Sequence, residues 1–169
     1  MASGERGSLP HGIASEKPLR SGELVTIDFT GPFDSYATDM TRTIALGEPG
    51  ARAREVYEIV RLAQQAAREK IRPGMKGIEA DALARDLIKE AGFGEYFGHG
   101  LGHGLGLEVH EQPVLSPRSE SILAPGMVVT IEPGVYIPSW GGVRIEDMVL
   151  ITSGGAESLT ESPRELIVI

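Results

Sequence analysis

Five glycines occupy alternate positions from Gly98 to Gly106 and flank the histidines His99 and His103. Each glycine would cost a helix about 1 kcal/mol, so a helical zinc motif is excluded here despite the spacing of four. Glycine lets backbone approach a ligand closely, and in an extended chain residues four apart project from the same face. The stretch therefore predicts an extended segment that brings both histidines to a bound group.

Histidine is concentrated in the same region. His99, His103 and His110 lie within twelve residues, and His11 is the only other histidine in the chain. Neither an HExxH motif nor a true GxGxxG loop is present, so these two types of site are not supported. The alternative interpretation is a glycine-rich turn whose histidines face solvent. Three histidines so close together favour a functional site.

Two aspartates lie in runs of β-branched residues, Asp28 within 25–30 and Asp39 within 38–43. An aspartate in such a run is costly unless it is paired, hydrogen-bonded or bound to a metal. A hairpin brings the two side chains onto one face, where they repel each other unless a cation lies between them. The alternative is an exposed hairpin in which Arg42 pairs with Asp39.

Two glutamates follow the same pattern. Glu132 ends a strand-like run at 128–132, and Glu146 follows Val143, Arg144 and Ile145. Arg144 and Glu146 are two residues apart and share a face of an extended chain, so Arg144 either orients Glu146 or binds a substrate group. Asp147 then points the other way and is expected to be structural. The alternative for each glutamate is a solvated strand position.

Together, four carboxylates and one imidazole match the ligands that two divalent cations require. Two such ions about 3.5–4 Å apart can hold a hydroxide and polarise a carbonyl. From the residues alone, the chain is a candidate dinuclear hydrolase.

The order of predicted elements favours an α+β fold with a largely antiparallel sheet and helices on one side. A hairpin is expected from extended segments at 23–29 and 36–46, joined by a turn-rich stretch at 30–35. Apolar residues at helical spacing then predict one helix between Gly50 and Pro73 and a second over 80–91, with Gly92 as its stop. Short extended segments are expected at about 94–99, 105–111, 127–132, 134–138, 142–152 and 165–169.

Composition excludes several function classes. The formal charge is −8, which argues against binding to nucleic acid or anionic lipid. No apolar run reaches the ~20 residues of a membrane span, and the N-terminus lacks the apolar core of a secretory signal. Cysteine is absent, which removes thiol catalysis and disulfides. A chain of 169 residues is expected to form a single domain in the cytoplasm.

Six motifs in order resemble the pita-bread metallopeptidases, which comprise methionine aminopeptidase, aminopeptidase P and prolidase. They lie at 9–11, 26–29, 38–43, 102–111, 131–136 and 142–147. The Asp-Met-Thr-Arg-Thr and Val-Arg-Ile-Glu-Asp runs are similar to the prolidase (Xaa-Pro dipeptidase) and aminopeptidase P branch. Methionine aminopeptidases usually lack the arginine two residues before the last glutamate. The resemblance implies a pita-bread fold, with a curved, largely antiparallel sheet and helices on its outer face.

The resemblance also implies a set of metal ligands, namely Asp28, Asp39, His103, Glu132 and Glu146. Asp39 and Glu146 would bridge two divalent ions, Asp28 would hold one ion, and His103 and Glu132 the other. Manganese is the usual metal of this family, while cobalt, zinc and iron suit the same ligands.

The implied reaction is hydrolysis of an Xaa-Pro bond at the free N-terminus of a di- or oligopeptide by a metal-bridging hydroxide. Glu132 would act as general base. His99 and His110 would contact the scissile carbonyl and the proline, and His11 would line the pocket. Arg144 would brace Glu146, with Tyr136 as a further supporting residue.

The single domain over residues 1–169 is expected to depart from the family pattern in one respect. The helices of the family's first repeat and its separate N-terminal domain are missing, which predicts an exposed apolar patch and a homo-oligomer or partner chain that covers it. A non-catalytic pita-bread binding module or an inactive fragment is the alternative, although such modules generally lose the metal ligands. A metal-independent, creatinase-like hydrolase is disfavoured, because unneutralised carboxylates are costly in a pocket.

Overall fold

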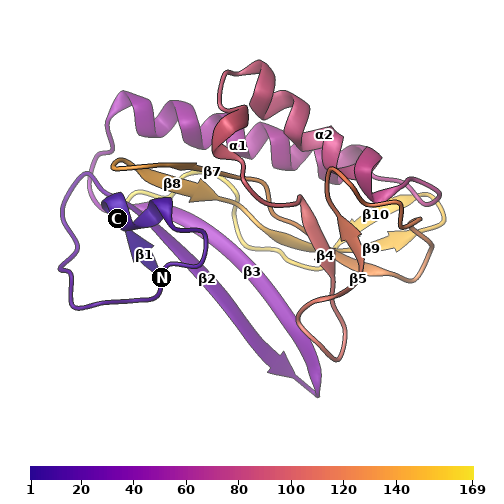
Figure 1. The fold of residues 1–169 in the computed structure, drawn as a ribbon. Coiled ribbons are helices and arrows are strands. Elements are labelled where there is room, and N and C mark those ends of the chain that lie inside the picture. The colour runs from indigo at the N-terminus through magenta and orange to yellow at the C-terminus, as the bar shows by residue number, and fades with distance from the viewer.

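The computed structural model describes residues 1–169 and places two helices on one side of three antiparallel sheets (Figure 1). The helices are α1 (Ala51–Lys70) and α2 (Gly77–Glu90), with short 3-10 turns at Gly4–Ser8 and Gly94–Tyr96. The strands are β1 (Ala2–Ser3), β2 (Leu24–Phe33), β3 (Tyr36–Ala45), β4 (Gly102–Gly104), β5 (Glu111–Leu115), β6 (Val128–Ile131), β7 (Gly134–Ile137), β8 (Gly141–Arg144), β9 (Asp147–Thr152) and β10 (Gly155–Ser158). The strand orders are β1-β2-β3, β10-β9-β6-β4-β5 and β7-β8, which confirms the α+β prediction.

The predicted hairpin is confirmed, and it is longer than expected. Strands β2 and β3 pair over ten positions and extend away from the helices (Figure 1). Asp34 and Ser35 form the two-residue turn with positive φ angles, the geometry whose twist suits a hairpin. The register sets Asp28 opposite Thr41 and Thr30 opposite Asp39. Because side chains alternate along a strand, both aspartates lie on one face, as predicted.

The apolar periodicity of both helices is confirmed by their buried faces. On α1, Val56, Val60, Ala63 and Ala67 are fully buried. They recur at the spacing that places side chains on one helix face. On α2, Ala80, Ala84 and Ile88 form the equivalent stripe. Gly92 follows α2 with φ of 86°, so it has the left-handed conformation expected of a helix stop. Neither helix combines the length and apolar composition needed for a transmembrane span.

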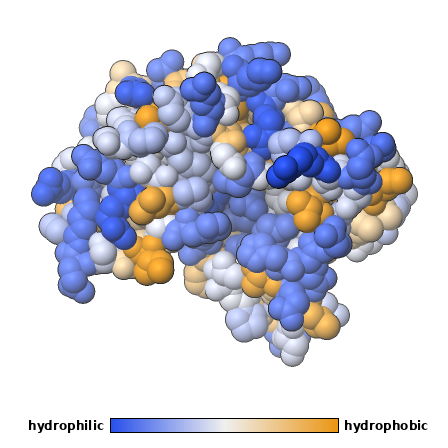
Figure 2. All heavy atoms as spheres, in the orientation of Figure 1, coloured by the Kyte–Doolittle hydropathy of each residue, from blue (hydrophilic) through white to orange (hydrophobic).

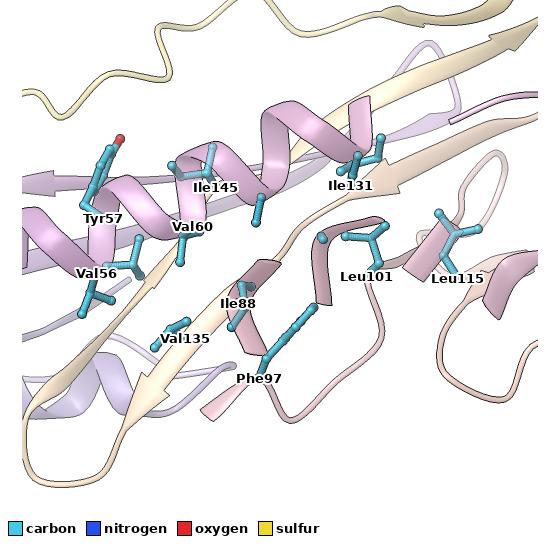
Figure 3. Close-up of a cluster of buried hydrophobic side chains, with 14 of the residues drawn as sticks. Val56, Tyr57, Val60, Ile88, Phe97, Leu101, Leu115, Ile131, Val135 and Ile145 are labelled. Atoms are coloured by element: carbon cyan, nitrogen blue, oxygen red, sulfur yellow. The ribbon is translucent and has the colours of Figure 1, made fainter. Parts of the chain in front are cut away.

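The hydrophobic core lies between the helices and the sheets. Figure 3 shows Val56 and Val60 of α1 near Val135 of β7, with Ile131 and Ile145 also in the cluster. Fully burying such a side chain contributes about 1.5–3 kcal/mol. Ile131 and Ile145 each precede a glutamate of the candidate site. The core therefore anchors the two chain segments that carry Glu132 and Glu146.

Four predicted extended segments differ from the structure. The segment 94–99 is wrong, because it contains no strand and begins with a 3-10 turn. Of the segment 105–111, only Glu111 lies in a strand, because β4 ends at Gly104, where its register against β5 shifts. A Cβ on Gly104 would lie 2.3 Å from the carbonyl oxygen of Gln112, so only glycine permits this close crossing. The segment 142–152 is two strands, because β8 pairs with β7 whereas β9 pairs with β6. The segment 165–169 forms only an isolated bridge from Val168 to Ala45.

Exposed apolar side chains gather on the hairpin rather than over a broad sheet face. Phe29, Phe33 and Tyr36 are each more than half exposed. On the side of the molecule drawn in Figure 2, hydrophobic residues form small groups separated by hydrophilic ones. The exposed apolar patch expected from the sequence does not form one continuous surface on this face.

Candidate metal centre

The metal ligands, histidines and arginine that the sequence analysis proposed line one cleft of about 850 Å³, and Tyr136 lies outside its lining. The cleft lies where the β2–β3 hairpin meets β4, β5 and the ends of β6 and β8. Only two of its eighteen lining residues are hydrophobic. The predicted residues that line it are His11, Asp28, Asp39, His99, His103, His110, Glu132, Arg144 and Glu146.

Three of these side chains converge closely enough to hold one cation. Oxygen or nitrogen atoms of Asp39, His103 and Glu146 all lie within 4.8 Å of one another. Thr30 donates a 3.0 Å hydrogen bond to Asp39, and Thr41 donates one of 2.6 Å to Glu146. These contacts fix one oxygen of each carboxylate and leave the other free for a ligand.

Glu132 and Asp28 lie next to this group. Glu132 Oε1 lies 3.3 Å from Nε2 of His103, which is itself 3.7 Å from Oδ2 of Asp39. The Thr30 hydroxyl lies 3.4 Å from Asp28 Oδ1, so one threonine joins the two hairpin carboxylates. All five predicted ligands thus border one space, although only three form the tight group.

The electrostatics of the cleft favour a cation. Burial raises the pKa of Asp39, and repulsion from Asp28 and Glu132 adds to this effect. Burial and the charges of Glu132 and Asp39 raise the pKa of Glu146 well above its ordinary value. Burial lowers the pKa of His103, but the neighbouring Glu132 outweighs it and raises the pKa overall. Carboxylate oxygens with one imidazole nitrogen are a donor set suited to divalent cations, and a cation would relieve this repulsion.

Arg144 contacts Glu146 through an intermediate residue and not directly. The guanidinium pairs with Asp28 at 2.5 Å and reaches Glu146 only through Thr41, whose hydroxyl accepts a 3.0 Å bond from Nε. The chain leaves β8 after Arg144, so the alternation that would put Arg144 beside Glu146 is interrupted there. Arg144 instead links Asp28 of the hairpin to the sheet formed by β7 and β8.

The alternative in which Arg42 pairs with Asp39 is wrong. Arg42 is three positions from Asp39 on β3, so it projects from the opposite face. Its guanidinium donates to Asp147 at 2.7 Å. Asp147 is fully buried and also accepts hydrogen bonds from Thr160 and Arg164. The prediction that Asp147 is structural agrees with these contacts.

Hydrogen bonding fixes the tautomer of His99. Its Nδ1 lies 2.7 Å from the carbonyl oxygen of Gly100, so Nδ1 carries the proton. Burial lowers the pKa of His99, so the ring is neutral, and Nε2 accepts from Tyr136 at 2.9 Å. The tyrosine oxygen accepts in turn from Arg144 at 3.0 Å, and burial raises its pKa to about 12. His99 and Arg144 are therefore joined through Tyr136.

The other two histidines border the open side of the cleft. The His110 ring lies 4.3 Å from that of His103 and is exposed to solvent. His11 is exposed in a turn after Gly4–Ser8, and Pro10 accepts a 2.7 Å bond from Arg144 that holds this turn against the cleft.

Sequence reasoning missed the threonines. Thr30 and Thr41 each hold a carboxylate, and Thr130 donates to Glu132 at 3.2 Å. Each threonine is two residues from a carboxylate of the candidate site, which lies on the same strand or directly after the end of that strand. This spacing puts hydroxyl and carboxylate on one face, and it was the signal available in the sequence.

Comparison with known proteins gives consistent results. Residues 1–153 match the family model described as metallopeptidase family M24. The chain is 54% identical over 167 residues to an Xaa-Pro dipeptidase of Pyrococcus furiosus, covering 99% of this chain and 48% of that protein. It is 56% identical over 169 residues to an uncharacterized peptidase, YqhT, of Bacillus subtilis, covering 100% of this chain and 48% of the relative. The chain thus spans about half the length of the curated relatives it matches.

Solved structures agree with the sequence matches. An Xaa-Pro dipeptidase from Bacillus anthracis superposes with a TM-score of 0.98 at 55% identity, over 99% of this chain and 47% of that one. An aminopeptidase P from Escherichia coli superposes with a TM-score of 0.82 at 34% identity, over 94% of this chain and 42% of that one. These similarities confirm the predicted pita-bread fold.

Proposed function

The chain belongs to metallopeptidase family M24, and from this premise we propose that its cleft is a two-metal centre that hydrolyses Xaa-Pro peptide bonds at a free N-terminus. The observation that carries the proposal is the convergence of Asp39, His103 and Glu146 within 4.8 Å, flanked by Asp28 and Glu132. The relatives named as Xaa-Pro dipeptidases support the substrate class.

In this proposal, Asp39, His103 and Glu146 would hold divalent ions, because their ligand atoms lie within 4.8 Å of one another. Asp28 and Glu132 would supply the remaining carboxylate ligands. When bound, such ions supply Lewis acidity and lower the pKa of water. Manganese suits the carboxylate-rich donor set, as do cobalt, zinc and iron.

The chain's own side chains supply the remaining chemistry. Burial would raise the pKa of Glu132, but its hydrogen bond with His103 and the charges of His103 and Arg144 lower it overall, so Glu132 is ionised and can accept a proton from the attacking water. His110 makes no side-chain hydrogen bond within the protein and is exposed, so it is free to contact the substrate carbonyl. Both ring nitrogens of His99 are engaged, so His99 shapes the wall of the proline subsite.

Further protein covers part of the hairpin in this proposal. The relatives are about twice as long as this chain, and Phe29, Phe33 and Tyr36 expose apolar surface on the hairpin face opposite Asp28 and Asp39. An additional segment, a partner chain or a second copy would cover these side chains.

The test of the proposal measures metal content and Xaa-Pro hydrolysis on one metal-loaded, size-fractionated sample. Two ions per chain with turnover is the expected result. Ions without turnover would favour the second candidate, a metal-binding module without catalysis. No divalent ion under any loading condition would overturn the two-metal centre.

We expect Glu132→Gln to lower the turnover number by about 10²- to 10⁴-fold, because glutamine keeps the shape of the side chain but cannot take a proton. Steady-state rates on an Xaa-Pro dipeptide, alongside metal content, measure this loss. Glu108→Gln, a charge change at an exposed position near the cleft, is the matched control and should retain full activity. Wild-type turnover in the Glu132 variant would rule out its role as general base.

A further inference from the structure

Thr41 lies between two charged side chains of the cleft, Arg144 and Glu146. Its side chain is fully buried on β3. The hydroxyl oxygen is 3.0 Å from Nε of Arg144 and 2.6 Å from Oε2 of Glu146. The backbone carbonyl of Thr41 also accepts a 3.0 Å hydrogen bond from the amide of Glu146. Thr41 therefore holds Glu146 through both its main chain and its side chain.

The direction of the two hydroxyl hydrogen bonds follows from the chemistry of Arg144. A guanidinium can only donate, so the Thr41 oxygen accepts from Nε and keeps its single proton for another acceptor. Arg144 is held in place, because its two terminal nitrogens donate to other groups, among them Tyr136 and Asp28. The only acceptor that the Thr41 hydroxyl then meets is Oε2 of Glu146.

This hydrogen bond limits how the Glu146 carboxylate can turn. Glu146 is buried, and its ligand atom lies within 4.8 Å of those of Asp39 and His103. A carboxylate offers about four lone-pair sites, so the hydroxyl takes one and leaves the others for a cation. Hydrogen-bond partners of this kind orient metal ligands, and their loss typically weakens metal binding by about 10- to 100-fold.

We propose that Thr41 is a positioning residue of the metal centre, and that its hydroxyl orients Glu146 for a divalent ion against the fixed donor of Arg144. This inference rests on the proposed metal centre and deepens it, since Thr41 is not itself among the proposed ligands. The alternative is that Thr41 only fills a buried position of β3. Valine has nearly the same shape and would then serve equally well.

The test is a calorimetric titration of chelator-treated wild type, Thr41→Val and Thr41→Ser with Mn²⁺. Valine keeps the shape and removes the hydroxyl, whereas serine keeps the hydroxyl and removes the methyl group. Thr41→Val should bind Mn²⁺ about 10- to 100-fold more weakly than wild type, and Thr41→Ser should bind as tightly as wild type. Thr41→Ala differs from Thr41→Ser only in the hydroxyl, so this second pair gives the same comparison if the valine variant does not fold.

Thr26→Val is the matched control. Thr26 is a buried threonine of β2 whose hydroxyl contacts that of Thr43 at 3.2 Å and no carboxylate. The substitution should leave Mn²⁺ binding unchanged, and circular dichroism checks the folding of every variant. Wild-type binding in Thr41→Val, weakened binding in Thr41→Ser, or an equal loss in Thr26→Val would each overturn the proposal.

The titration contains no substrate, so it separates this inference from the proposed reaction. Mn²⁺ binding that depends on the Thr41 hydroxyl, without Xaa-Pro hydrolysis, would refute the reaction and leave the role of Thr41 intact. Hydrolysis by wild type together with unchanged Mn²⁺ binding in Thr41→Val would refute the role of Thr41 alone. Wild type that binds no divalent ion would overturn both.

Discussion

Replacing Asp39 by asparagine is expected to abolish Xaa-Pro hydrolysis and to remove tight binding of divalent ions. Asp39 is buried, and its ligand atom lies within 4.8 Å of those of His103 and Glu146. Asparagine keeps the shape and can still accept from Thr30, but it lacks the charge that opposes the ions. Metal content by plasma mass spectrometry and dipeptide hydrolysis measure the two losses.

In metal-free protein, the same substitution should raise the free energy of unfolding. Burial and the charges of Asp28 and Glu132 raise the pKa of Asp39, so its ionised form destabilises the folded state at neutral pH. Asp39→Asn should therefore be more stable than wild type when metal is absent. The difference should shrink as the pH falls through the raised folded-state pKa, and it should be lost below the ordinary value of 3.8, where the carboxyl is protonated in both states.

Asp34→Asn is the matched control for this experiment. Asp34 lies at the exposed tip of the hairpin with φ of 48°, a conformation that asparagine tolerates. It should leave metal content, hydrolysis and metal-free stability unchanged. Wild-type ion binding in Asp39→Asn would contradict the assignment of this carboxylate to the metal centre.

Asp147→Asn is expected to lower the free energy of unfolding by about 3–5 kcal/mol, because it removes the charge from a fully buried ionic network. The carboxylate accepts from Arg42 at 2.7 Å, from Thr160 at 2.6 Å, and from Gln64 and Arg164. Asparagine would leave two arginines without their counter-charge. Urea unfolding of metal-free protein followed by circular dichroism measures the loss.

The loss of unfolding free energy in Asp147→Asn should depend on pH. Burial alone would raise the pKa of Asp147, but hydrogen bonds from Arg164 and Thr160 and the charge of Arg42 lower it overall. Its stabilising contribution is therefore present above the ordinary value of 3.8 and is lost as the pH falls through the folded pKa. The free energies of unfolding of wild type and Asp147→Asn should therefore converge at acidic pH. Asp86→Asn, an exposed aspartate on α2, should cost less than about 0.5 kcal/mol, and an equal cost at Asp147 would refute the network.

The sequence by itself determined the features that depend on neighbours along the chain. Alternation along 24–45 identified the hairpin and put Asp28 and Asp39 on one face, because side chains of a strand alternate. Helical spacing identified α1 and α2 in the same way. The grouping of carboxylates and histidines in such segments was sufficient to predict one site, and the order of its motifs was sufficient to predict the family.

Only the tertiary structure decided which distant groups meet. Arg144 pairs with Asp28, 116 positions away, rather than with Glu146 two positions away, because the chain changes sheets between β8 and β9. Arg42 meets Asp147 across 105 positions, and that carboxylate fixes the amide of Gln64. No local pattern encodes such pairs, since they follow from how sheets and helices pack against each other. The candidate metal centre could be predicted from the sequence because its proposed ligands fall in regular strands and motifs, whereas the contacts of Asp147 with Arg42 and Gln64 exist only where distant elements pack together.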